Sequence, residues 1–529
     1  MKLAHFRSAA SASVFAAAAV VASSLAPACG GSNSSGFQTD GGPGSGSGGG
    51  SGSGSGGGFA SSSGSVTGTG SGGLLPSGDG GGTTTTSSCP NGGTTSISGT
   101  VYDPALKNPL YNVVVYVPGS TPSALPQGAT CDSCNSLYTG NPIATALTDT
   151  SGKFTLKNAP SGSNVPLVIQ VGKWRKQLTV ATVTACQDNP QPDKSLSLPS
   201  KGSEGDIPQI AVSTGGADSL ECLLDRIGLD PSEYTGGAGG TGHIHIFEGS
   251  AGPAGIKPPS MTPAASSSAS LWDSQADLMN YDIVLLSCEG AETGSMNQQA
   301  LEQYTAAGGR VFASHYHYAW FNTGPFMADN LATWTTDPTA STIASTDITE
   351  ILSGAIDAVI DQTLPDGGPF VKGQALDTWL GVVGGLETTG HPGDLQIAQA
   401  RHNADVGAAN VASQAWISAD TDTTVPNATQ YFSFNTPVGA PIDDAGEPAY
   451  CGRVVYSDLH VGGVAGLFGS GQSDYGGVLG SGGTVPTGCV NRDLSPQEKA
   501  LEFMLFDLSS CVVPDNQPPP PPPPSNPPK

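Results

Sequence analysis

The hydrophobic pattern of this chain changes near residue 200, and that change limits the folds that it can adopt. Between residues 89 and 200, apolar residues alternate with polar ones in short runs separated by Gly and Pro, as at 113–117 and 165–171. This pattern is typical of antiparallel strands in a β-sandwich. After residue 205, short apolar runs alternate with segments of helical period, which favours a parallel sheet with helices on both faces. The sequence therefore predicts a multidomain chain with folded units at 89–200 and 205–513.

The elements of the second unit follow one another in the order expected of such a sheet. We predict strands at 207–212, 243–247, 282–287 and 310–314, and helices at 218–229, 270–279 and 297–307. Ligands of these sheets bind at the carboxyl ends of the strands. Residues 335–449 fit the pattern poorly, with one predicted helix at 371–383 and one late strand at 430–435. We expect them to form an irregular insertion that covers the strand ends.

The first 28 residues have the layout of a bacterial signal peptide. Basic Lys2 and Arg7 precede an Ala-rich stretch that is too short to span a bilayer, and Ala26-Pro27-Ala28-Cys29 follows. These four residues satisfy the rule for simple secretion, and they also resemble a lipobox, whose cysteine receives a lipid anchor. We expect a lipoprotein attached to the membrane through Cys29, in the cell envelope or on the surface. The alternative is a secreted protein.

Two further segments lack the apolar surface needed to offset the entropy lost on folding. The chain holds 75 Gly and 42 Pro but only 12% charged residues, and much of this excess lies in Gly/Ser-rich 29–88 and Pro-rich 514–529. We expect both segments to be disordered. Anchored at Cys29, the first would act as a tether with a root-mean-square reach of about 40–45 Å.

Acidic residues outnumber basic ones by 44 to 19, which gives a net charge of −25 at pH 7. The largest basic cluster is Lys173-Trp174-Arg175-Lys176, so nucleic acid is not an expected partner. Ten cysteines fit an oxidising compartment.

If Cys29 carries a lipid, nine cysteines remain, and the odd number leaves at least one thiol unpaired. Cys288, at the end of a predicted buried strand, is the best candidate for that thiol. The spacing of Cys131 and Cys134 favours a local disulfide, called here a local staple, between the two within a loop. Two further groups are expected to contain disulfide partners: Cys89 with Cys186 around the first unit, and Cys451, Cys489 and Cys511 near the end of the second.

Three segments of the first unit carry a family resemblance. They are Ile-Ser-Gly-Thr-Val-Tyr-Asp at 97–103, Asn-Val-Val-Val at 112–115, and Thr-Asp-Thr-Ser-Gly-Lys-Phe-Thr-Leu at 148–156, the last followed by Asn158-Ala159-Pro160. In order and spacing they resemble the carboxypeptidase regulatory-like domain, a transthyretin-type sandwich. The resemblance implies a stalk, a spacer or a weak binder of carbohydrate or protein, without catalytic activity.

Three segments of the second unit carry another resemblance. They are Tyr-Asp-Ile-Val-Leu-Leu at 281–286, Ala-Ala-Gly-Gly-Arg-Val-Phe-Ala-Ser-His at 306–315, and Gly-Arg-Val-Val-Tyr-Ser-Asp-Leu-His at 452–460. They are similar to the class I glutamine amidotransferase-like fold, which has a flavodoxin-like parallel sheet, and most similar to its trehalose-utilisation-type (ThuA-like) branch. That branch has histidines where this chain has His315 and His460. The turn that holds the amidotransferase cysteine contains Ser314-His315-Tyr316 here, so the amidotransferase reaction is not implied.

The candidate catalytic residues are His315, His460 and Glu289. Glu289 directly follows a predicted strand, and if it faced His315 the two would form an acid–base pair. The alternative is that Cys288-Glu289-Gly290 forms a plain turn from strand to helix. We therefore commit to no catalytic residue, and the sequence identifies no cofactor.

Five histidines fall at predicted strand ends: His243, His245, His315, His317 and His460. Imidazoles two residues apart on a strand share one face, and clusters of imidazoles bind zinc or copper. The alternative is that these side chains satisfy hydrogen bonds at the rim of a pocket. No Asp or Glu completes a recognised metal-binding spacing, so none of the five is assigned as a metal ligand.

These features predict an exported, lipid-anchored protein of the cell envelope that binds a carbohydrate or a surface partner through a catalytically degenerate ThuA-like domain. The alternative is an extracellular hydrolase or sugar-modifying enzyme with a His/Glu pocket, with or without a metal ion. A cleft in which His315, His460 and Glu289 converge would favour the enzyme.

Overall fold

The computed structural model describes residues 84–85, 89–90, 93–132, 134–215, 217–249, 263–337, 340–347, 355–443, 446–460, 489–515 and 517. The predicted signal peptide, Cys29, and nearly all of the predicted tether and Pro-rich tail lie outside these residues. The described residues belong to one compact unit. Among them, no helix is both long and apolar enough to cross a membrane.

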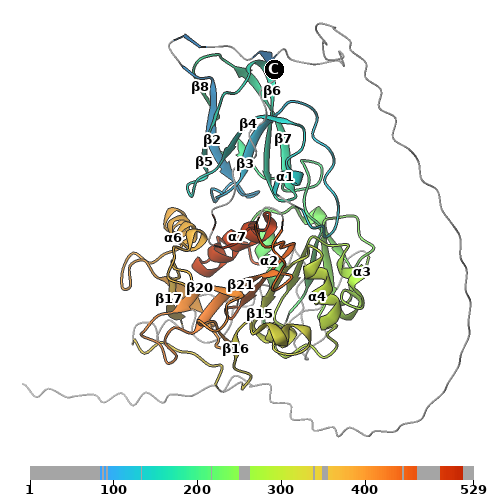
Figure 1. Ribbon diagram of the computed structural model, residues 1–529, viewed down its shortest axis with the longest axis vertical. Helices are drawn as coiled ribbons and strands as arrows, with labels where there is room; N and C mark the ends of the chain where they lie inside the picture. Colours follow the sequence, from blue (N-terminus) through green and yellow to red (C-terminus); the bar gives the residue numbers. More distant parts are fainter. Residues whose placement is uncertain are drawn as a thin grey trace, which may run out of the picture. The chain divides into compact units, whose positions relative to one another are not determined.

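Two sheets form the first part of the chain (Figure 1). Their strands are β1 (Thr84–Thr85), β2 (Ser96–Tyr102), β3 (Val114–Pro118), β4 (Pro142–Leu147), β5 (Lys153–Lys157), β6 (Ser161–Val171), β7 (Trp174–Val183), β8 (Asp188–Pro190) and β9 (Leu196–Ser197). One sheet has the order β1-β6-β3-β4 with β7 paired to β6, and the other has the order β5-β2-β8 with β9 paired to β2. Ile97, Val115 and Phe154 from both sheets share one core, so the sheets pack face to face.

The predicted antiparallel pairing holds throughout the first of these sheets. In the second sheet β2 pairs antiparallel with β5 but parallel with β8 and β9. The two strands that pair in parallel, β8 and β9, lie near the end of the first part. They have only two or three residues each, too few to show a hydrophobic period in the sequence.

A larger sheet of eleven strands fills the second part of the chain. Its strands are β10 (Ile210–Ser213), β11 (Tyr234–Gly236), β12 (Ile244–Glu248), β13 (Ser266–Ser267), β14 (Ile283–Leu286), β15 (Arg310–Ser314), β17 (Ala355–Ile360), β18 (Leu395–Ala398), β20 (Ser413–Ala419), β21 (Thr429–Thr436) and β22 (Gly452–Ser457). The helices are α1 (Cys134–Leu137) in the β3–β4 loop, and α2 (Leu220–Arg226), α3 (Gln275–Leu278), α4 (Gln298–Ala306), α6 (Val371–Val383) and α7 (Pro496–Ser509) around this sheet. A separate pair joins β16 (Thr333–Trp334) to β19 (Ala404–Asp405).

The large sheet is mixed, which corrects the expectation of a purely parallel one. Strands β11, β12, β10, β14, β15 and β22 lie side by side in this order and are parallel. Strands β21, β20, β17 and β18 continue it with antiparallel pairing. The expectation that 335–449 is irregular is therefore wrong for much of that segment. Its strands are buried on both faces and lack the alternation that reveals a strand in a sequence.

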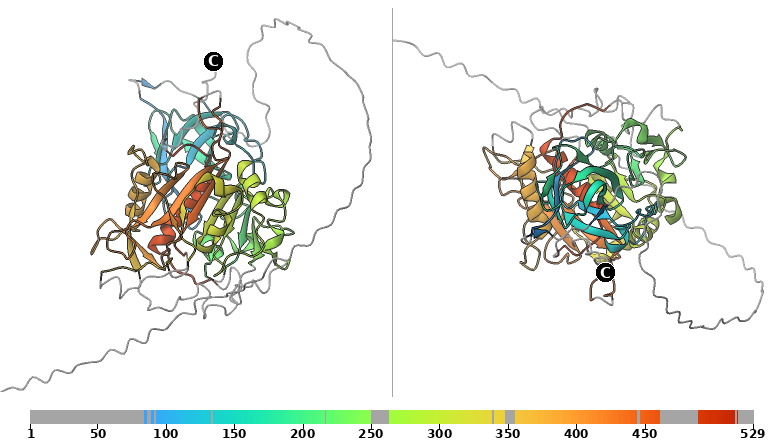
Figure 2. Two further views of the ribbon diagram at one scale, coloured as in Figure 1. Left: turned by 60° about the horizontal axis from the view of Figure 1, so that its bottom comes forward. Right: turned by 90° about the horizontal axis from the view of Figure 1, so that it is seen from above.

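Helices cover both faces of the large sheet, as predicted (Figure 2). On β14, Leu285 packs in the same core as Leu501 of α7, whereas the next residue, Leu286, packs in the core that contains Leu301 of α4. Successive side chains of a strand point to opposite faces, so α7 and α4 lie on opposite sides of the sheet.

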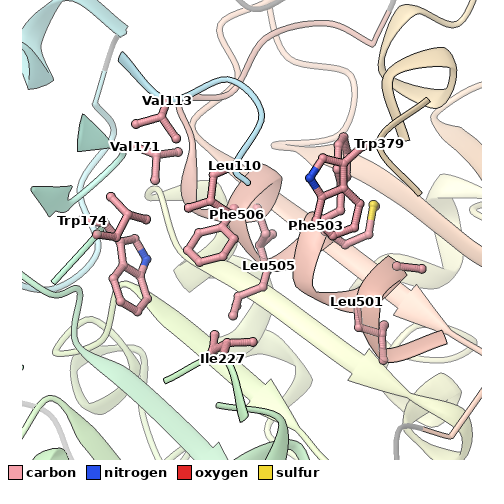
Figure 3. Close-up of a cluster of buried hydrophobic side chains, with 14 of the residues drawn as sticks. Leu110, Val113, Val171, Trp174, Ile227, Trp379, Leu501, Phe503, Leu505 and Phe506 are labelled. Carbon is pink, nitrogen blue, oxygen red and sulfur yellow. The ribbon is translucent and has the colours of Figure 1, made fainter. Parts of the chain in front are cut away.

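Helix α7 also contacts the sandwich strands. Figure 3 shows Leu110 and Trp174 of the first part near Phe506 of α7. The Trp174 and Phe506 rings meet edge to face at 5.7 Å between centroids. The two parts of the chain thus share one hydrophobic core.

Four disulfides connect the described cysteines: Cys89–Cys186, Cys131–Cys451, Cys134–Cys511 and Cys222–Cys489. The first pair confirms the expectation for the sandwich. Cys131 and Cys134 do not form a local staple, because each is bonded to a distant segment of the second part. For the same reason the three late cysteines do not pair with one another. Among the described cysteines Cys288 is the unpaired, buried thiol, as predicted.

Candidate functional site

Three adjacent parallel strands end at the same edge of the large sheet. In the sheet, β15 lies between β14 and β22. Cys288 follows β14, His315 directly follows β15, and His460 follows β22. The parallel register therefore brings one thiol and two imidazoles together where ligands of such sheets bind.

The three side chains touch one another. Cys288 Sγ lies 3.3 Å from His315 Nδ1, and His460 Nε2 lies 3.1 Å from the same nitrogen. The two imidazole rings meet edge to face, with centroids 4.8 Å apart. All three residues are buried, with exposed fractions of 0% for Cys288 and 3% for each histidine. His315 is thus the centre of the cluster.

His315 has a strained backbone. Its φ of 45° lies in the left-handed region, which a bulky side chain rarely adopts and which costs of order 1–3 kcal/mol. The Tyr456 hydroxyl oxygen lies 2.8 Å from the His315 carbonyl oxygen, and the Ser314 hydroxyl accepts from the Cys288 amide at 2.9 Å. These contacts hold a sharp turn between β15 and the 3₁₀ helix His315–Trp320, and the turn directs His315 toward its neighbours.

Burial keeps the cluster uncharged at neutral pH. It lowers the pKa of His315 to about 3 and that of His460 well below the usual range, and the positive charge of Arg401 adds to both shifts. Burial also raises the pKa of the Cys288 thiol to about 12. Neutral imidazoles keep a nitrogen lone pair, which can accept a proton or bind a metal ion.

The donor atoms of Cys288, His315 and His460 all lie within 4.8 Å of one another, so the cluster could hold a metal ion. Two of its outer atoms, His315 Nε2 and His460 Nδ1, have no hydrogen-bond partner within the part of the chain that the structure describes. The Asn403 side chain lies beside His315 and favours its protonated form.

The other candidate histidines lie elsewhere. His243 Nδ1 pairs with Glu233 at 2.5 Å, and His245 contacts the Tyr281 hydroxyl at 2.9 Å. His317 Nε2 lies 2.9 Å from the Ser287 carbonyl. His315 and His317 are in a 3₁₀ helix rather than on a strand, so the alternation that was expected to align them does not apply. Of the five candidate ligands, only His315 and His460 come together.

Glu289, the third candidate catalytic residue, is buried beside Gly249. Cys288, the preceding residue, is the one that contacts His315. An acid–base pair of Glu289 with His315 stays a prediction, whereas the Cys288 thiol is the neighbour that the structure places against the His315 imidazole. The sequence held a signal for this, because Cys288 was both the predicted unpaired thiol and the last residue before the turn.

A segment of the expected insertion passes beside the cluster. Asp458 is fully buried, and its carboxylate accepts from the amides of Asn403 and Ala404 and from the Tyr456 hydroxyl. Burial raises the pKa of Asp458 to about 7 in spite of these donors. The bonds fix the neighbouring Arg401, whose charge acts on all three cluster residues. Asp458 lies within the segment 452–460 that carries the family resemblance, whereas no sequence motif indicated Arg401.

An aromatic row extends from the cluster. The Tyr316 ring lies 4.2 Å from that of His315, Tyr318 follows at 6.3 Å, and Trp334 lies 6.4 Å beyond. Tyr316 and Trp334 are half-buried. The Tyr318 hydroxyl donates to the exposed Glu292 carboxylate. The row thus combines accessible aromatic surface with an exposed acceptor.

A second polar group lies at the antiparallel end of the sheet. His391 Nδ1 is 3.6 Å from Asp357 and 3.7 Å from Asp420. Asp394 and Asp422 also lie close enough to His391 for a metal ion to bind to the histidine together with either aspartate.

No protein-family model matches this chain, and no curated protein matches it. Two solved structures of type II cohesin–X-dockerin complexes from Acetivibrio cellulolyticus share 16% identity with it. The first, a C-terminal interface mutant, covers 27% of this chain and 76% of its own with a TM-score of 0.14. The second, an N-terminal interface mutant, covers 26% and 85% with a TM-score of 0.15. At such scores the likeness supports no functional conclusion.

Proposed function

We propose that this chain is an exported protein of the cell envelope that binds a carbohydrate at the carboxyl ends of β14, β15 and β22. In this proposal its second part is a ThuA-like domain without amidotransferase activity, and the sandwich is a regulatory-like spacer. Cys29 carries the lipid anchor, and the Gly/Ser-rich segment is the tether. The four disulfides fit an oxidising compartment outside the cytoplasm.

The aromatic row carries the binding proposal. Half-buried Tyr316 and Trp334 offer ring faces on which the apolar face of a sugar can stack, and Glu292 offers a carboxylate to its hydroxyls. Arg401 is half-buried at the same site, and no ion pair to it occurs among the described residues. Its guanidinium suits a ligand carboxylate, because planar bidentate pairing is its strongest interaction. We therefore expect an acidic sugar.

Glycan-array binding tests the proposal on the purified mature chain. We expect Trp334→Ala to weaken binding at least tenfold, and Arg401→Gln to weaken binding of acidic glycans more than that of neutral ones. Tyr102→Ala is a matched control, since this half-buried tyrosine lies on β2 of the sandwich. Equal binding by wild type and Trp334→Ala, with both folded, would contradict the proposal. Mass spectrometry that finds Cys29 unmodified would contradict the anchor alone.

A hydrolase or sugar-modifying enzyme is the second candidate function. The observation that favours it is the strained turn that directs His315 toward His460, because strained backbone is often retained at reactive sites. In the same glycan panel, product formation by wild type that is lost in His460→Ala would select the enzyme over the binding protein.

A further inference from the structure

We infer that Cys288, His315 and His460 form a binding site for one transition-metal ion, zinc or copper, at the carboxyl ends of β14, β15 and β22. A thiolate with two imidazoles is a ligand set that both ions accept. The inference does not rest on the proposed carbohydrate binding, which uses the aromatic row and Arg401 rather than these three donor atoms.

The distances between the donor atoms suit a single ion. With metal–nitrogen bonds of about 2.0–2.1 Å and a metal–sulfur bond of about 2.3 Å, tetrahedral ligands lie about 3.3 Å apart for two nitrogens and about 3.6 Å for sulfur and nitrogen. The observed separations are 3.1 Å between the histidine nitrogens and 3.3 Å between Cys288 Sγ and His315 Nδ1. For these two pairs an ion would need an outward shift of a few tenths of an ångström, and the donor atoms of Cys288 and His460 lie within 4.8 Å of each other.

Hydrogen bonding alone explains the cluster less well. A neutral imidazole nitrogen has one lone pair, yet Cys288 Sγ and His460 Nε2 both approach His315 Nδ1 within 3.3 Å. One hydrogen bond accounts for one of these two approaches, whereas a shared metal ion accounts for both.

Neighbouring residues can accept the hydrogen bond that a metal-bound histidine donates from its other ring nitrogen. With its Nδ1 on the metal, His315 would carry a proton on Nε2, and the adjacent Asn403 oxygen has no other partner in the described part of the chain. Such a hydrogen bond fixes the tautomer and the ring orientation of a metal ligand. The strained backbone of His315 fits the same purpose, because it orients the central ligand.

The free thiol of Cys288 also fits the role of a metal ligand. Cys288 is the one described cysteine without a disulfide, in a protein that otherwise pairs its cysteines. Metal binding would replace the thiol proton, which leaves to solvent, with a metal–sulfur bond, so that no oxidant or reductant is needed. Three protein ligands leave a fourth position for water or a ligand oxygen.

Metal stoichiometry tests the site directly. The purified chain is stripped with a chelator, loaded with Zn²⁺ or with copper, passed over a desalting column and measured by elemental analysis. We expect wild type to retain one equivalent that Cys288→Ser and His460→Gln both lose. Co²⁺ loading should give a sulfur-to-cobalt charge-transfer band in wild type that is absent in Cys288→Ser.

Control variants separate this site from other cation binding. His391→Gln removes the histidine of the Asp-rich group, and His243→Gln removes a partly exposed histidine. Both should keep the Cys288-dependent equivalent and the cobalt band. Thermal unfolding of the stripped proteins verifies folding, and Zn²⁺ should raise the melting temperature of wild type more than that of Cys288→Ser.

The inference is overturned if wild type and folded Cys288→Ser retain the same amount of metal and give the same cobalt spectrum. That result would leave glycan binding untouched. Conversely, a loss of glycan binding in Trp334→Ala does not bear on the metal, so the two proposals can fail separately.

Discussion

At the scale of single residues, Asp458 supports the site without contacting its donor atoms. Its carboxylate accepts two backbone amides and one hydroxyl at 2.7–2.9 Å. In Asp458→Asn, an amide group would replace one acceptor oxygen and face backbone donors. We expect a loss of about 2–4 kcal/mol in the free energy of unfolding, because buried donors lose their acceptor.

Urea unfolding of Asp458→Asn and wild type measures this loss. The matched control is Asp273→Asn, an exposed aspartate, for which we expect a change within about 0.5 kcal/mol. Equal unfolding midpoints for Asp458→Asn and wild type would show that the segment near Arg401 is held by other contacts.

The sequence located two of the three cluster residues. His315 and His460 were predicted because each follows a strand that a family motif marks. Cys288 was predicted as the unpaired thiol but not as a neighbour of His315, because adjacent residues at a strand end point in different directions and a sequence does not show where the strand stops. Arg401 could not be predicted, since its position depends on pairing between strands far apart in the chain.

At the scale of elements, local signals located some helices and strands and missed others. Helix α6 begins and ends at the predicted residues, and β15 occupies its predicted range. Helix α7 was not predicted, although Ser495 and Glu498 form a capping box at its start and Pro496 occupies its first turn. The strands β17, β18 and β20 were also missed, because antiparallel partners that are distant in sequence leave no local pattern.

The contact between the end of β2 and α7 should make stability depend on pH. Asp103 follows β2, and its carboxyl interacts directly with that of Glu502 in α7. Burial raises the pKa of Asp103 to about 6, and burial together with the Asp103 charge raises the pKa of Glu502 well above its usual range. The folded state therefore binds protons that the unfolded state releases. The contribution of Asp103 to stability is complete below its unfolded pKa of about 4 and is lost as the pH rises through about 6.

Asp103→Asn tests this dependence, because the amide can still accept from the Lys107 amide while it donates to Glu502. We expect the variant to be more stable than wild type at pH 8 by about 1–3 kcal/mol and to lose less stability between pH 4.5 and pH 7. Unfolding by urea at several pH values gives both quantities. Asp366→Asn, at an exposed turn, should show the same change of stability with pH as wild type. If the stability of Asp103→Asn changed with pH as steeply as that of wild type, the Asp103–Glu502 pair would not hold a proton in the folded state.

At the scale of the whole molecule, two neighbouring cysteines join the sandwich to the large sheet. Cys131 and Cys134 lie in one loop, and their partners Cys451 and Cys511 belong to the second part of the chain. A close pair of cysteines in a sequence usually indicates a local bond or a redox motif, so this connection could be recognised only once the loop was placed against the sheet. The sandwich is therefore bonded to the domain that carries the candidate site.

Removal of these two bonds should loosen the junction more than it loosens either sheet. The bonds close sequence separations of 320 and 377 residues, and each bond lost costs about 2–5 kcal/mol in the chain-entropy account. A variant with all four cysteines replaced by serine should exchange amide hydrogens faster in α7, because its contacts to Trp174 would be held by packing alone. Cys89→Ser with Cys186→Ser is the control, because it opens a bond within the sandwich, and there α7 should keep its protection. If α7 exchanged equally in both variants, the shared hydrophobic core, rather than the disulfides, would hold the two parts together.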